Sequence, residues 1–456
     1  MIDKIIDELA NDYMKCAKNA KKEEVIKVLN DAKYILQNNK DKTPEEIINI
    51  IIEGCVKDLN NIMNEYKIPG IMSSIEIDNI NINIYGGLTR TNGEPLTKKS
   101  LFDVSSITKL YTELLAYKLI NEGVFVLDEK IQDIDPRFKN IGNVTVEDIL
   151  RFSSKFQTSC LIENTKTKTN AQNKLYNTEV TGLGKYNYND IGMMILKEVM
   201  EYLENKTFEE LLNEYILKPY NLNNTYLTVP KDKLHLVTGT PNIDGSVNDL
   251  KANVLGGFSG HAGIRVSSND LIKLSSEINK EYLLRKGLYI PHKYNSLRSN
   301  KMGNLYINDG REESYFGRLA PKKSIAAQGS TRVITRASLF KNIDINSTIL
   351  TNAASMTDES LFNAIQKENK KRLEIGKKLL IPSDLIKERE YDSKTYKMHD
   401  VRCIVPESQV IDKMSFKYDN EINLKLLLLN KILKEYDHYD KDITIDRDIT
   451  NENKIR

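Results

Sequence analysis

Ser106 and Lys109 are the residues whose types and spacing most directly suggest chemistry, because they form a Ser-x-x-Lys tetrad. One helical turn separates them, so both side chains would lie on the same face of a helix. The positive end of the helix axis disfavours a second positive charge there. We therefore expect Lys109 to lose its proton near neutral pH and to activate the serine hydroxyl. Such a pair could build an acylating serine.

The residues after the tetrad predict the helix that must position it. Apolar residues recur at three-to-four spacing between Leu110 and Ile120, and Gly123 suits a left-handed helix cap. A second Ser-x-x-Lys spacing, at residues 338–341, lies in sequence that predicts a loop or a strand. The first copy is therefore the candidate nucleophile, with helix capping as the alternative role for Ser106.

Further matches make the chain resemble the serine β-lactamase and penicillin-binding-protein-like hydrolases, in particular the class C β-lactamase and esterase branch. Five segments match in the family's order, at residues 101–128, 188–196, 217–226, 256–263 and 267–271. At Phe152-Ser153-Ser154 the chain departs from the family's usual His-x-Ser-Gly turn. The resemblance implies an α+β fold, with an antiparallel β-sheet flanked by helices plus an all-helical subdomain.

The segment Tyr188-Asn189-Asp190 is similar to the family's second catalytic motif, Tyr-x-Asn or Tyr-x-Asp. The resemblance implies that Lys109 or the phenolate of Tyr188 takes the proton of Ser106. Asp190 would hold Lys109 and Tyr188 in place by charge-assisted hydrogen bonds. Two alternatives stay open: Tyr186 competes for the role of Tyr188, and Asp190 could be an ordinary helix cap.

The third catalytic motif is altered. The family carries Lys-Thr-Gly or His-Thr-Gly on a core strand, whereas this chain reads Ala327-Gln328-Gly329, in the register set by a closing Leu350-Thr351-Asn352. The backbone N–H of Ser330 could still form an oxyanion hole with that of Ser106, because that role needs only an amide. The missing cation could be replaced by Lys322, Lys323 or Arg332.

Substrate contacts are expected from three residues that the same resemblance places near the nucleophile. Gln328 offers a neutral amide, and Gly329 is the retained residue of the third motif. His261 stands in a Gly-His-Ala-Gly stretch typical of this branch, where it could equally be structural.

Composition predicts a globular protein and excludes little else. The chain has 456 residues, a net charge of +2 and 40% hydrophobic residues, enough for a large core. Its lysines are interleaved with acids and form no basic stripe with aromatics, so we expect no nucleic-acid partner. The acidic N-terminus and the lack of a long apolar run predict a cytoplasmic protein without a membrane segment. No metal or organic cofactor is implied, because the cysteines lack metal-ligand spacing: Cys16, Cys55, Cys160 and Cys403.

Three units are predicted along the chain: an N-terminal helical segment (1–55), a β-lactamase-like serine hydrolase domain (56–378) and a C-terminal extension (379–456). Thr43 followed by Pro44 is a helix-start signal in the first unit. Residues after about Asp440 are expected to be mobile.

The expected function is acyl transfer through an ester on Ser106, as in a hydrolase of a small ester, amide or peptide. Two alternatives remain. The altered third motif favours a catalytically silent binding protein on the same fold. The terminal extensions favour an acyltransferase or peptide-processing enzyme of a cytoplasmic biosynthetic pathway, in which the extensions bind a protein partner.

Overall fold

The computed structural model describes most of the chain. Excepted are residues 1, 18, 66–67, 91–92, 158–161, 240–245, 285–288, 291–299, 309–318, 323, 331–335, 342–344, 353–357, 382–385, 392–393, 400–406, 437–440 and 451–456. Cys160, Cys403, Lys323 and Arg332 therefore lie outside the described residues.

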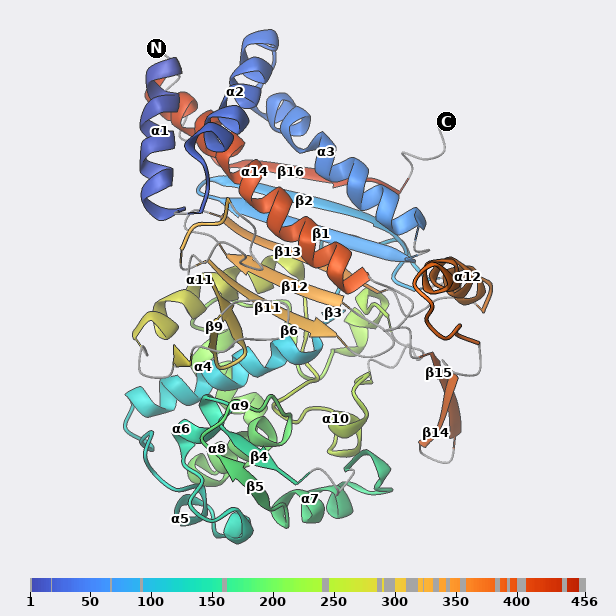
Figure 1. Cartoon of the computed structure of the whole chain (residues 1–456). Coiled ribbons are helices and arrows are strands. Elements are labelled where there is room, and N and C mark those ends of the chain that lie inside the picture. The colour runs from blue at the N-terminus through green and yellow to red at the C-terminus, as the bar shows by residue number, and fades with distance from the viewer. Residues whose placement is uncertain are drawn as a thin grey trace.

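A large β-sheet forms the centre of the protein (Figure 1). Among the described residues it has nine strands in the order β16-β2-β1-β13-β12-β11-β10-β9-β8, and every neighbouring pair except β16 and β2 is antiparallel. The strands are β1 (Gly70–Ile77), β2 (Ile80–Gly87), β8 (Tyr289–Ile290), β9 (Asn300–Met302), β10 (Leu305–Ile307), β11 (Ile325–Ser330), β12 (Arg336–Lys341), β13 (Ile345–Thr351) and β16 (Ile443–Asp448).

Alternating side chains of the central strands enter two different cores. In β1, Ile71 and Ile75 pack with α3 and α14, whereas Met72 packs on the opposite side with the helix that follows Ser106. The helices are α3 (Pro44–Glu65) and α14 (Glu407–Tyr436) on the first face, and α4 (Thr108–Asn121) and α11 (Ser268–Leu284) on the second. This layering confirms the predicted α+β fold.

A mostly helical region lies beyond α4, at the bottom of Figure 1. It contains α5 (Ile131–Ile134), α6 (Val146–Leu150), α7 (Lys168–Tyr176), α8 (Ile191–Glu204), α9 (Phe208–Leu212) and α10 (Leu250–Val254), with a small hairpin of β4 (Ser154–Phe156) and β5 (Val180–Leu183). Short strands β3 (Phe102–Asp103), β6 (Thr225–Tyr226) and β7 (Arg265–Val266) connect this region to the rest.

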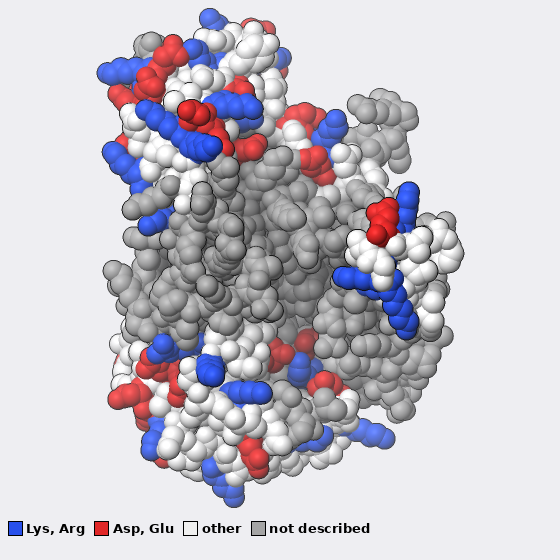
Figure 2. Space-filling model, viewed as in Figure 1, with Lys and Arg blue, Asp and Glu red and all other residues white. Residues whose placement is uncertain are grey.

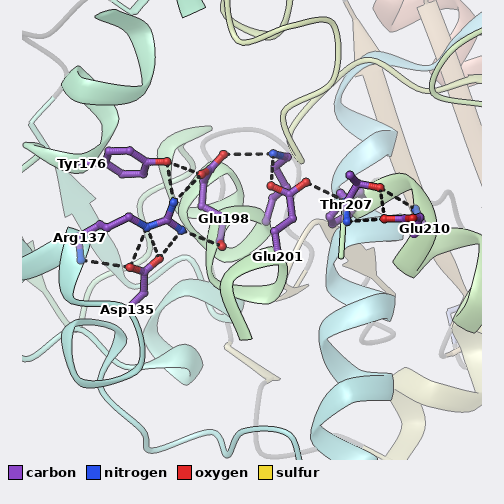
Figure 3. A network of polar contacts seen from close by, with 9 residues as sticks. Asp135, Arg137, Tyr176, Glu198, Glu201, Thr207 and Glu210 are labelled. Carbon is purple, nitrogen blue, oxygen red and sulfur yellow. Dashed lines mark hydrogen bonds and ion pairs between the residues drawn. The ribbon is translucent and has the colours of Figure 1, made fainter. Parts of the chain in front are cut away.

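A network of ion pairs fixes α8 within this region (Figure 3). The Arg137 guanidinium donates to both carboxylate oxygens of Asp135 and lies 3.6 Å from the carboxylate of Glu198 on α8. The hydroxyl of Tyr176 donates to the same Glu198 at 2.6 Å. Farther along α8, a Glu201 carboxylate oxygen accepts the backbone N–H of Phe208 at 2.8 Å. These contacts tie α8 to its neighbours along its length.

The terminal segments pack onto the sheet. Helices α1 (Ile2–Cys16) and α2 (Lys22–Asn38) share a core with Leu424 and Leu428 of α14. The predicted boundary after residue 55 falls inside α3. The expectation that residues after Asp440 are mobile is wrong for residues 443–448, because β16 pairs with β2 at the sheet edge through six residue pairs. Residues 451–456 lie outside the described residues. Two elements remain to the side, α12 (Asp358–Glu374) and the hairpin of β14 (Ile386–Tyr391) and β15 (Lys394–His399).

The surface shows mixed charge. On the face in Figure 2, the described Lys and Arg residues lie among Asp and Glu, without a large region of one sign. No described helix is both long enough and apolar enough to cross a membrane.

Candidate active site

Ser106 lies in a strained turn that begins the helix α4. Its predecessor Ser105 has φ of 48°, in the left-handed region that costs a non-glycine residue about 1–3 kcal/mol. The Asp103 carboxylate accepts the backbone N–H of Ser105 at 2.8 Å and so helps to hold this conformation. The turn places Ser106 one residue before Ile107, the residue preceding α4. The predicted placement of the nucleophile at a helix start is therefore observed.

Lys109 is completely buried beneath Ser106. Its ammonium donates to the Ser106 Oγ at 3.0 Å and to the backbone carbonyl of His261 at 3.2 Å. A third contact, of 2.9 Å, joins Lys109 Nζ to Asp190 Oδ1. The lysine thus connects the serine to the acidic residue of the second motif.

The protonation expected for Lys109 is wrong. Burial acts to lower the pKa of the Lys109 ammonium, but the negative charge of Asp190 and the neighbouring Tyr188 outweigh it, so the pKa is raised. The helix-start argument considered only α4, whereas the deciding charge comes from the start of α8. The raised pKa favours the charged form of Lys109, and a charged lysine that donates to Oγ is not set up to take the serine proton.

Tyr188 stands over Lys109 at the protein surface. The Lys109 Nζ lies 4.9 Å from the Tyr188 ring centroid, and this ring stacks on Phe152 at 5.4 Å with an interplanar angle of 9°. Tyr188 is 40% exposed, so the residue is accessible from solvent. Tyr186, the competing residue, instead packs against the core at a tilted angle to Phe152. The predicted register is therefore supported over the alternative two residues earlier.

Asp190 accepts from two lysines and caps no helix. Its Oδ1 pairs with Lys109, and its Oδ2 accepts from Lys251 at 2.7 Å. Burial acts to raise the pKa of Asp190, but Lys109, His261 and Lys251 hold it well below the usual range. The capping role falls to Asn189, whose side-chain oxygen accepts the backbone N–H of Gly192. The helix-cap alternative for Asp190 is therefore excluded.

Sequence reasoning missed Lys251 and the role of its neighbour Asp249. Burial acts to lower the pKa of Lys251, but Asp190 and Asp249 raise it, so this lysine is a second cation in the site. Asp249 caps α10 by accepting the backbone N–H of Ala252. An aspartate at a helix start was a detectable signal, but nothing in the sequence around Lys251 pointed to Asp190, 61 residues earlier.

His261 supports the site from behind and does not face a substrate. Its ring nitrogens lie 2.9 Å from Ser259 Oγ and 2.9 Å from Asp249 Oδ1, and the residue is 1% exposed. Only its backbone carbonyl reaches Lys109. The expectation that His261 binds substrate is therefore wrong, because the fold uses both ring nitrogens internally.

The altered third motif lies directly against the nucleophile turn. A Cβ on Gly329 would stand 2.0 Å from the carbonyl oxygen of Val104, so only glycine allows β11 to approach this closely. The same approach brings the following residue, Ser330, to the level of the turn, where the strand pairs it with Arg336 of β12. Ala327 is fully buried in the core and Gln328 is half-buried. No charge therefore enters the site from this part of β11.

Lys322 does not replace the missing cation. Its backbone N–H donates to the carbonyl of Cys16 at the end of α1, so the chain at Lys322 is attached to the N-terminal helices. The cation that the structure does bring to the site is Lys251, from α10.

A pocket of about 450 Å³ opens beside the catalytic residues. Tyr188, Asp190 and Lys251 line one part of it, and Phe156, Ile162 and Leu175 provide apolar walls.

Comparisons with known proteins identify the family of the chain. The family model described as beta-lactamase matches residues 56–357. A beta-lactamase of Providencia stuartii is 24% identical over 227 residues, which cover 48% of this chain and 58% of that protein. The chain therefore matches little more than half the length of this curated relative.

Solved structures show the same fold. A beta-lactamase/D-alanine carboxypeptidase from Pseudomonas syringae gives a TM-score of 0.55 at 18% identity, over 69% of this chain and 96% of that one. An octameric penicillin-binding protein homologue from Pyrococcus abyssi gives 0.53 at 18% identity, over 75% and 89% of the two chains. These similarities concern the fold, and the reaction must be argued from the site itself.

Proposed function

The chain belongs to the beta-lactamase family, and from the geometry of its site we propose that it is a serine-dependent acyl-transfer enzyme working through an ester on Ser106. One observation carries the proposal. The buried Lys109 ammonium lies 3.0 Å from the Ser106 Oγ and 2.9 Å from the Asp190 carboxylate, with the exposed ring of Tyr188 above it.

In the acylation step, the phenolate of Tyr188 takes the serine proton and becomes a neutral phenol. Because Lys109 donates to Oγ, the serine hydrogen is free to point to another acceptor, and the Tyr188 oxygen is the candidate. Oγ attacks the substrate carbonyl carbon, and the charged Lys109 compensates the negative charge that develops on Oγ. The carbonyl oxygen becomes an oxyanion held by the backbone N–H groups of Ser106 and Ser330. Collapse breaks the bond to the leaving group, which receives the proton from Tyr188.

Deacylation reverses these roles. Tyr188 takes a proton from water or from another nucleophile, which attacks the acyl carbon, and the proton returns to Ser106 Oγ as the ester bond breaks. Hydrolysis and transfer differ only in the attacking molecule.

The preferred substrate is a small ester, amide or peptide without an essential carboxylate beside the scissile bond. Ala327 is buried and uncharged where the resemblance would place a cation. The pocket beside Tyr188 would hold the acyl or leaving group against Phe156, Ile162 and Leu175.

A catalytically silent binding protein is the second candidate. The buried Ala327 favours it, because the position provides no charge for a carboxylate-bearing substrate. The intact set of contacts around Lys109 opposes it.

The test is covalent labelling of Ser106. Intact-mass spectrometry after treatment with p-nitrophenyl butyrate or a fluorophosphonate should show a single adduct, mapped by peptide digestion to Ser106. Ser106→Ala should abolish it, and Ser105→Ala is the matched control that should retain it. A folded wild type that forms no adduct with either reagent would favour the silent protein.

A further inference from the structure

The turn between β9 and β10 reaches the nucleophile from the side of the sheet. Asn304, at this turn, donates its side-chain amide to the backbone carbonyl of Ser106 at 2.8 Å. Its own backbone N–H donates to Glu113 Oε1 at 2.9 Å. Glu113 follows Lys109 by one turn of α4, and both Asn304 and Glu113 are buried. The turn is therefore attached to α4 at two points around the nucleophile.

Gly303 allows the turn to lie close to α4. It has φ of 55°, and a Cβ there would stand 2.7 Å from the Glu113 carboxylate. A larger residue would be strained and would push the turn away from α4. Gly303 therefore lets Asn304 reach the Ser106 carbonyl.

The sheet register places Asn304 beside the altered third motif. Tyr306 of β10 pairs with Ala326 of β11. Continuing this antiparallel register by two residues brings Asn304 level with Gln328. A neutral amide therefore stands at the nucleophile beside the strand that lacks the family's usual cation.

We infer that Asn304 is a positioning residue that fixes the Ser106 peptide for acylation, an inference that rests on the proposed function. Asp103 holds the Val104–Ser105 peptide through the Ser105 N–H, and Asn304 holds the Ser106–Ile107 peptide through the Ser106 carbonyl, so the Ser105–Ser106 peptide lies between two fixed peptides. Together they set the direction of the Ser106 N–H, which must point at the oxyanion. Asn304 does this without adding a charge next to Lys109.

Asn308 provides a matched control at the other end of β10. It is also buried, and its side-chain amide donates to two backbone carbonyls, those of Ala320 and Pro321, at 3.2 and 2.9 Å. Replacing either asparagine by alanine removes a similar buried amide, but only Asn304 touches the nucleophile peptide.

The experiment compares Asn304→Ala with Asn308→Ala in the full chain. Both should lower the melting temperature by similar amounts. Only Asn304→Ala should slow acylation by p-nitrophenyl butyrate, by about 10-fold or more, with the change in kcat and little change in KM. Equal acylation rates in the two variants would overturn the inference.

A spectroscopic measurement tests the contact independently of activity. Ser-Ile pairs occur at Ser74, Ser106 and Ser324, so carbonyl-13C serine with 15N isoleucine labels few amide resonances. Loss of one resonance in Ser106→Ala assigns the amide of Ile107. Asn304→Ala should shift this resonance and Asn308→Ala should not. If the Ile107 resonance is unchanged in Asn304→Ala, the inference is overturned even if Ser106 is acylated in the wild type. If the resonance shifts in Asn304→Ala but the wild type forms no covalent adduct at Ser106, only the proposed function is overturned.

Discussion

Lys109 and Asp190 form an ion pair in which the lysine is completely enclosed and the aspartate is 25% exposed, with 2.9 Å between Nζ and Oδ1. Since the buried partner depends on the other for its charge, Asp190 decides the protonation of Lys109. The proposed nucleophile therefore lies beside a lysine whose pKa is raised, which favours Tyr188 as the proposed group that moves the proton.

Tyr188→Phe should lower the rate of Ser106 acylation by at least about 10²-fold, because it removes the proposed general base. The exposed position of Tyr188 predicts a melting temperature within a few degrees of wild type. Stopped-flow release of p-nitrophenol and thermal unfolding measure the two effects. Tyr186→Phe serves as control, and an equal loss of rate in that variant would contradict the assignment.

Asp190→Asn should destabilise the protein by about 3–5 kcal/mol, because it leaves the buried Lys109 without a counter-charge. With Asp190 neutral, burial acts on Lys109 with much less opposition and should lower its pKa. Urea unfolding measures the free-energy change. Lys251→Gln is the informative comparison, because it leaves the Lys109 pair intact and should cost less. If Lys251→Gln lowers the free energy of unfolding more than Asp190→Asn does, Asp190 mainly stabilises the charge of Lys251.

Stability should fall in acid. The pKa values of Asp190, Asp249 and Glu198 lie below their usual values, through cations that outweigh burial. Their contribution is fully present above the unfolded values near 4 and is lost as the pH falls through the lowered folded values. The free energy of unfolding from pH 6 to pH 2 should therefore decrease below about pH 4. Glu198→Gln should flatten this decrease, and an unchanged profile would contradict the role of Glu198.

Arg137→Met should destabilise the protein by about 3–5 kcal/mol, since Asp135 is fully buried and would lose its partner. The network in Figure 3 would then hold α8 less firmly, with a smaller loss of acylation than in Tyr188→Phe. Arg151→Met is the control, because its surface pair with Glu147 should be worth less than about 1 kcal/mol. Similar losses of unfolding free energy in the two variants would show that the burial of Asp135 does not determine how much the loss of its partner destabilises the protein.

Neutral esters should acylate Ser106 faster than penicillins of similar leaving-group ability. The reason is that Ala327 offers no charge to the substrate carboxylate. Second-order rates for a fluorescent penicillin and a neutral ester make the comparison. Faster acylation by the penicillin would indicate that another residue binds the carboxylate. Lys251→Gln tests whether that residue is Lys251.

Motif spacing and the family resemblance predicted that Ser106, Lys109, Tyr188 and Asp190 lie together, and Lys109 does contact the other three. Their roles in catalysis stay predictions. The charge of Lys109 could not be predicted, since it depends on Asp190 across 81 residues of chain. Lys251 and Asn304 were missed for the same reason. Their partners are set by how α10 and the β9–β10 turn pack, and no nearby motif encodes that packing.

The parallel strand β16 was also beyond sequence reasoning. Its residues alternate polar and apolar, but the segment is short and charged, and its partner β2 lies more than 350 residues earlier. Helix α14 is also far in the sequence from the strands it covers, so its contribution to the core of the sheet was not predicted.

The position of β16 has a consequence for synthesis of the chain. Strand β2 is complete by Gly87, yet the backbone groups on its outer edge find their partner only when residues 443–448 leave the ribosome. At about 5–20 residues per second this takes roughly 20–70 s. During that interval β2 is an open edge on which another nascent chain could pair. Pairing of β16 therefore closes this edge of the sheet, and the edge stays open until residue 448 has been made.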